Sequence, residues 1–164
     1  MIYNMDFLIS AMVILLLILW HFLGQKRAED LNNRVFLFFA VLGTADVVAE
    51  FFTNYYITSY NSDMENAAVI VTTIFYLLQA LLPVTFIFYI QTLHEQKIIS
   101  AKKMFISGVP TLVLISVILT NPFTEKLFSF DVTAGYVKGP WYLLMYVSAL
   151  GHFAVALLLI LLWR

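Results

Sequence analysis

Apolar residues dominate five long stretches of the chain, and the short segments between these stretches hold most of the charged residues. A stretch of about 20 apolar residues is long enough to cross a bilayer as a helix. The pattern predicts helices over residues 7–23, 35–56, 67–92, 104–120 and 141–163. We therefore predict an all-α membrane protein with five transmembrane helices, forming a single membrane domain over residues 1–164.

The connection between the fourth and fifth stretches, residues 121–140, has a different pattern. Apolar and polar residues alternate over 127–132, residues 133–135 supply a turn, and 136–138 can pair back. A short β-hairpin lying over the helix bundle fits this pattern. An irregular loop held by its aromatic side chains against the membrane surface fits it equally well, because two strands alone are marginally stable.

Composition supports the membrane assignment and excludes several other classes. Hydrophobic residues make up 62% of the 164 residues and charged residues only 12%, which is too apolar for an ordinary soluble domain. The nine basic residues are not gathered in one patch, so we expect no nucleic-acid partner. The chain has no cysteine, which excludes disulfides and thiolate metal sites. We expect no cofactor.

The basic residues also predict an orientation. Seven of the nine fall on one side of a five-span arrangement: Lys26, Arg27, Arg34, Lys97, Lys102, Lys103 and Arg164. Lys126 and Lys138 fall on the other side. Under the positive-inside rule, this bias places the N-terminus outside and the C-terminus in the cytoplasm of a multi-pass protein of the cell membrane. The three tryptophans near helix ends are placed to anchor the helices at the membrane–water interface: Trp20, Trp141 and Trp163.

The second stretch carries polar residues at a depth where they are costly. Asp46, Glu50 and Asn54 recur at every fourth position, so a helix places them on one face. An ionised carboxylate at the bilayer centre costs at least ~2.5 kcal/mol. This polar stripe must therefore face protein, water or a ligand rather than lipid.

Polar residues of other helices are predicted at matching depths. From a rise of 1.5 Å per residue, Gln79 and His152 reach about the level of Asp46. Glu50 lies one turn further out, at the level of four residues of the third and fifth helices: Thr72, Thr73, Tyr76 and Ser148. The third and fourth helices contain Pro83 and Pro110, which are places for a bend.

These polar residues allow more than one interpretation. A hydrogen-bond network among Asp46, Gln79 and His152 would simply hold the helices together. Two carboxylates in one stripe favour a ligand site or an ion pathway, because acids within membranes usually mark such places. His152 fits a counter-ion for Asp46, a proton-responsive switch or a packed neutral imidazole. A zinc site of Asp46, Glu50 and His152 has no supporting spacing, so we predict no metal.

The chain contains no nucleophile elbow, phosphate-binding loop or kinase signature. Several stretches, however, follow one another in a recognisable order: residues 31–36 (Leu-Asn-Asn-Arg-Val-Phe), Asp46, residues 88–90, Pro110, residues 121–123, residues 128–131 and residues 135–139. Together they resemble the multi-helix membrane input domain at the N-terminus of many bacterial diguanylate cyclases and sensor histidine kinases. This domain is often called the histidine-kinase N-terminal seven-helix region.

The resemblance implies a receptor-like domain that senses a small ligand and signals to a cytoplasmic cyclase or kinase domain, with a homodimer formed through that domain. The family's domain has two more helices, so the chain would hold the first five of seven, with the output domain beyond it. No catalytic residue is expected within the chain itself.

Our leading hypothesis is a sensory membrane domain that binds a small ligand from the outer side. Its predicted ligand-binding residues are Asp46, Glu50, Asn54, Tyr76, Gln79 and His152. A cationic or hydrogen-bond-donating ligand suits the acids, and an apolar ligand fits as well if the acids pair with His152. The rival hypothesis is a transporter or channel component in which Asp46, Glu50 and His152 relay protons or cations.

Overall fold

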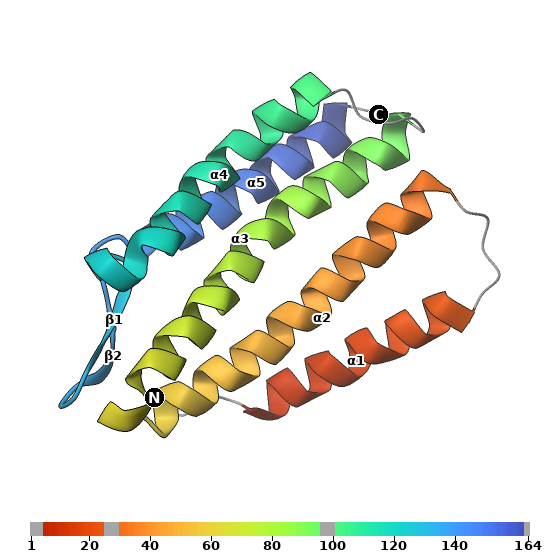
Figure 1. Cartoon of the computed structure of the whole chain (residues 1–164). Coiled ribbons are helices and arrows are strands. Elements are labelled where there is room, and N and C mark those ends of the chain that lie inside the picture. Colours follow the sequence, from red (N-terminus) through yellow and green to blue (C-terminus); the bar gives the residue numbers. More distant parts are fainter. Residues whose placement is uncertain (1–4, 25–29, 96–100, 163–164) are drawn as a thin grey trace.

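The computed structural model describes residues 5–24, 30–95 and 101–162, without the side chains of residues 5, 6, 95, 101–104 and 106. In it the chain forms five long helices, all of them long and apolar enough to cross a membrane, and one antiparallel hairpin (Figure 1). The helices are α1 (Met5–Gly24), α2 (Leu31–Thr58), α3 (Glu65–Glu95), α4 (Ala101–Thr124) and α5 (Leu143–Leu162). A short 3₁₀ turn, η1 (Ser62–Met64), joins α2 to α3.

The predicted helices are confirmed, and their ends differ by a few residues. The second helix begins at Leu31 instead of residue 35, because Asp30 is its N-cap and the backbone carbonyl of Asp30 accepts the backbone N–H of Arg34. The fourth helix continues past residue 120 to Thr124, with Pro110 and Pro122 inside it. Some residues on which the predicted membrane orientation rests lie outside the described residues, namely Lys26, Arg27, Lys97 and Arg164. Trp163 also lies outside them.

The helix α3 is the centre of the bundle. It packs against α2 on one side and against α4 and α5 on the other, while α1 packs on α2 (Figure 1). The ends of α2 and α4 and the starts of α3 and α5 lie at the same end of the bundle as the strands, which we call the hairpin end. The arrangement leaves the polar stripe of α2 beside α3.

The hairpin, one of the two forms that fitted the sequence, is the form observed. Strand β1 (Phe128–Asp131) pairs with β2 (Gly135–Lys138), with Phe130 opposite Tyr136. The three-residue loop, residues 132–134, is followed by Gly135, whose φ of 69° suits a left-handed position at the start of β2. Asp131 closes this loop, because its carboxylate accepts the backbone N–H groups of Thr133 and Ala134.

Asn121, in the last turn of α4, holds the base of the hairpin. Its side-chain oxygen accepts the backbone N–H groups of Leu127, at 2.7 Å, and Phe128, at 3.3 Å. Its amide nitrogen donates to the carbonyl of Phe128 at 2.9 Å. Gly139 lies against this base so closely that a Cβ there would collide with the carbonyl of Lys126. The hairpin is therefore fastened to the end of α4.

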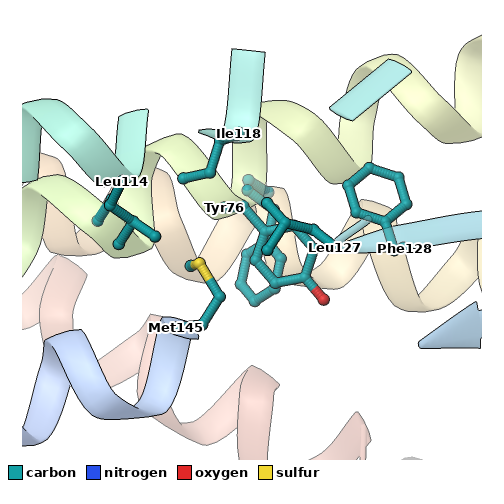
Figure 2. Close-up of a cluster of buried hydrophobic side chains, with 9 residues drawn as sticks. Tyr76, Leu114, Ile118, Leu127, Phe128 and Met145 are labelled. Atoms are coloured by element: carbon teal, nitrogen blue, oxygen red, sulfur yellow. The ribbon is translucent and has the colours of Figure 1, made fainter. Parts of the chain in front are cut away.

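The main hydrophobic cluster lies where the hairpin meets the helices. Its buried residues come from α2, α3, α4, α5 and the hairpin, and six of them are labelled in Figure 2: Tyr76, Leu114, Ile118, Leu127, Phe128 and Met145. Leu127, Phe128 and Ile118 are almost completely buried. Burying such side chains stabilises a fold by about 1.5–3 kcal/mol each, which explains why a two-stranded sheet persists here.

Candidate functional site

The polar stripe of α2 faces a cavity of about 510 Å³ between α2, α3, α5 and the hairpin. Five of the six residues predicted for the ligand site line it: Asp46, Glu50, Asn54, Tyr76 and Gln79. A spacing of four residues, close to the helical period of 3.6, places Asp46, Glu50 and Asn54 on the cavity side of α2. Asp46 lies near the middle of the 28-residue helix.

Several polar atoms on this wall have no partner. Within the described part of the chain, the buried atoms without a hydrogen bond include Oδ1 of Asp46, Oγ1 of Thr53 and Nδ2 of Asn54. Thr53 and Asn54 are each only 3% exposed, and both line the cavity. Buried polar groups in proteins are nearly always hydrogen-bonded, so such atoms indicate a place for water or a ligand.

Pro83 adds a further polar group to the α3 wall. A proline has no N–H, so the carbonyl of Gln79, four residues earlier, loses its usual helical partner. Gln79 and Pro83 both line the cavity, and α3 nevertheless continues without a break from Glu65 to Glu95. Of the residues expected near Glu50, Tyr76 and Ser148 line the cavity, whereas the Thr73 hydroxyl donates to Val69 within α3.

Tyrosines form the side of the cavity nearest the hairpin. Tyr76 of α3 and Tyr136 of β2 share a hydrogen bond between their hydroxyls at 2.6 Å. Tyr142 lies edge-on to Tyr76, with ring centroids 6.4 Å apart, and its hydroxyl is 3.1 Å from that of Tyr146. All four rings line the cavity. They come from three separate segments, which produces an aromatic wall beside the two carboxylates.

The cavity wall also includes a basic residue, Lys138 of β2. Its ammonium group lies 4.4 Å from the centre of the Tyr142 ring, which is a cation–π contact. Lys126, at the base of the hairpin, makes the same kind of contact with Trp141. Both basic residues of the hairpin end are thus held by aromatic rings, and one of these rings faces the cavity.

His152 does not join this site. Its Nδ1 lies 2.7 Å from the carbonyl of Ser148, and its Nε2 lies 3.0 Å from the hydroxyl of Thr111 in α4. The side chain is 6% exposed and lines a separate, mostly apolar cavity of about 620 Å³ beside α4 and α5. Because the Ser148 carbonyl is an acceptor, Nδ1 of His152 must carry a proton. In the neutral tautomer with that proton, Nε2 accepts a hydrogen bond from the Thr111 hydroxyl.

The partnership of Asp46 with His152, one of the three roles that the sequence allowed, is not observed, because His152 bonds to Thr111 and Ser148 instead. Of the three roles considered for His152, a packed imidazole agrees with these bonds, which occupy both ring nitrogens. Among the described residues, no three histidine, aspartate or glutamate side chains are placed to hold a metal ion.

The sequence interpretation missed several residues of the cavity wall, namely Thr53, Lys138, Tyr142 and Tyr146. The spacing of Tyr142 and Tyr146, four residues apart at the start of the fifth helix, was a signal for a shared face. Lys138 carried no such signal, because its place depends on the pairing of the hairpin. Searches of protein families, characterised proteins and solved structures find nothing that matches this chain.

Proposed function

We propose that this chain is the sensory membrane domain of a bacterial signalling protein, which binds a small ligand from the outer side and signals to a cytoplasmic diguanylate cyclase or kinase domain. The observation that carries the proposal is the polar cavity at the hairpin end, with unpartnered atoms of Asp46, Thr53 and Asn54 on its wall. The resemblance to input domains of such proteins supplies the signalling role.

The signal itself would pass through the helices that form the cavity. A ligand shifts a conformational equilibrium only by its different affinities for the two states. The cavity wall includes α2, α3, α5 and the hairpin, so a ligand that draws them together would change how α3 packs against its neighbours. Pro83, in the cavity wall, is the place where α3 bends most readily.

The rival function, a proton- or cation-coupled transporter, loses one of its three relay residues. His152 is hydrogen-bonded to Thr111 and does not line the cavity of Asp46 and Glu50. Flux measurements in proteoliposomes discriminate between the two functions. A transporter shows proton or cation flux that Asp46→Asn abolishes, whereas a sensory domain shows none.

The decisive experiment on the signalling role is to read the gene beyond codon 164. A cyclase or kinase domain in the same reading frame supports the proposal, and a stop codon at that point overturns it. If such a domain follows, its activity in membranes should change in the Glu50→Gln variant and stay unchanged in Glu65→Gln. Glu65 is a matched control, because it is an exposed acid at the start of α3 outside the polar cavity.

The outer location of the cavity has its own test. The chain has no cysteine, so Ser62→Cys and Asp30→Cys each provide a single thiol, at opposite ends of the bundle. A membrane-impermeant maleimide should label Ser62→Cys in intact cells and label Asp30→Cys only after permeabilisation. The reverse pattern would place the cavity mouth in the cytoplasm.

A further inference from the structure

The walls of the polar cavity indicate a ligand with two different ends. This inference rests on the proposed function only in taking the cavity as a ligand site. It does not depend on signalling or on transport. Two groups of side chains, one acidic and one hydrogen-bond-donating, line the same cavity at different levels.

The first group is acidic and lies deeper along α2. Asp46 and Glu50 are both half-buried and are one helical turn apart on the cavity wall. Two ionised carboxylates one helical turn apart repel each other, and an ammonium group between them relieves the repulsion. An ammonium is also the ion that tyrosine rings attract, and the ring of Tyr142 already holds the ammonium of Lys138.

The second group donates hydrogen bonds and lies nearer the hairpin. Asn54 is one turn beyond Glu50 and 97% buried, and its Nδ2 has no acceptor. Lys138, also on the wall, adds a positive charge from β2. A carboxylate satisfies both of these groups. The rise from Glu50 to Asn54 is about 6 Å along the helix axis, which is within the reach of a small molecule.

We propose that the polar cavity binds a small zwitterion, such as an amino acid, with its ammonium group at Asp46 and Glu50 and its carboxylate at Asn54 and Lys138. The tyrosines cover the carbon chain between the two ends. A simple amine lacks the carboxylate that contacts Asn54 and Lys138. A simple carboxylate lacks the ammonium group and is repelled by the negative charges of Asp46 and Glu50. A zwitterion therefore binds more tightly than either half of the molecule alone.

The test uses the purified chain in nanodiscs of phosphatidylcholine, a lipid without net charge that does not concentrate cations. Binding of γ-aminobutyrate, n-butylamine, butyrate and n-butanol is measured by calorimetry and by thermal stabilisation, with empty nanodiscs as the blank. Glycine and β-alanine serve as shorter zwitterions. We expect at least one zwitterion to bind about tenfold or more tightly than n-butylamine, and butyrate to bind no more tightly than n-butanol.

Matched variants separate the two ends of the ligand. Lys138→Gln should lower the affinity of the best-bound zwitterion to nearly that of n-butylamine. Lys126→Gln, at the other cation–π pair, should leave the affinity of the zwitterion unchanged. Glu50→Gln should weaken the binding of the zwitterion and of n-butylamine to the same extent. Glu65→Gln should weaken the binding of neither compound.

Three results would each overturn the proposal. One is the absence of binding by all three zwitterions, and another is that the best-bound zwitterion binds no more tightly than butyrate and n-butanol. The third is an equal effect of Lys138→Gln and Lys126→Gln. None of these results bears on whether a cyclase or kinase domain follows the chain, so the sensory role is judged separately.

Discussion

The hydroxyl groups of Tyr76 and Tyr136 lie 2.6 Å apart, in a hydrogen bond that joins the middle helix of the bundle to the hairpin. Tyr76 is 5% exposed, and its ring also packs on Phe128 of β1. Both tyrosines line the polar cavity. The position of the hairpin is therefore coupled directly to α3 at the wall of the polar cavity.

This relationship predicts a coupling between the two tyrosines. Tyr136→Phe should lower the free energy of unfolding by about 1 kcal/mol, because the buried hydroxyl of Tyr76 loses a partner. Adding Tyr76→Phe to this variant should lower the free energy of unfolding only slightly further, since neither hydroxyl of the pair then remains unpaired. Thermal unfolding in detergent measures both effects. Tyr56→Phe, on α2 and outside the cavity wall, is the control, and additive losses at Tyr76 and Tyr136 would contradict the coupling.

The base of the hairpin should depend on Asn121. Asn121→Ala removes three hydrogen bonds at a side chain that is 1% exposed and leaves the Leu127 amide without its acceptor. We expect a loss of about 3 kcal/mol, because each buried group left unsatisfied costs about 1–3 kcal/mol. The neighbouring Thr120→Ala, at an exposed position, should change stability by no more than about 0.5 kcal/mol. Similar losses in both variants would show that Asn121 does not hold the hairpin.

His152 should be coupled to Thr111 and independent of Asp46. In a double-mutant cycle, Thr111→Val and His152→Leu should have a coupling energy of about 0.5–3 kcal/mol, because the two side chains share one hydrogen bond. Asp46→Leu combined with His152→Leu should be additive. Asp46→Leu alone should not lower the melting temperature, since it removes an unpartnered acid from an apolar helix. A rescue of Asp46→Leu by His152→Leu would mean that the two residues do interact.

The hairpin loop should respond to acid through Asp131. Hydrogen bonds from the Thr133 hydroxyl and from the Ala134 and Thr133 amides hold the pKa of the Asp131 carboxyl below its usual range. Because the folded-state pKa is lowered, this stabilisation is complete above the unfolded-state value of about 4 and is lost as the pH falls through the folded value.

The test compares melting temperatures of the wild-type chain and Asp131→Asn from about pH 6 down to about pH 2. The wild-type chain should be the more stable at the upper end, and the difference should shrink as the pH falls. Asn keeps a side-chain oxygen that can accept the loop amides, so the variant still folds. A difference that is constant across this range would show that the Asp131 charge does not stabilise the loop.

The sequence by itself determined the long helices and the polar face of α2. Both follow from periodicity: runs of apolar residues set the helix lengths, and the spacing of Asp46, Glu50 and Asn54 sets their common face. Alternation over residues 127–132 also indicated the hairpin, although it left an irregular loop as an equal alternative. These features are local, so they can be recognised without knowing how the helices pack.

Only the tertiary structure decided which side chains share a cavity. The rise per residue predicts how deep His152 lies along its helix, but not the direction in which it points, and α5 turns it toward Thr111 rather than toward the acids. Lys138 and Tyr136 reach the cavity because the hairpin folds back over the bundle. That placement depends on the burial of Leu127 and Phe128 among α3, α4 and α5, and such long-range packing leaves no periodic mark in the sequence.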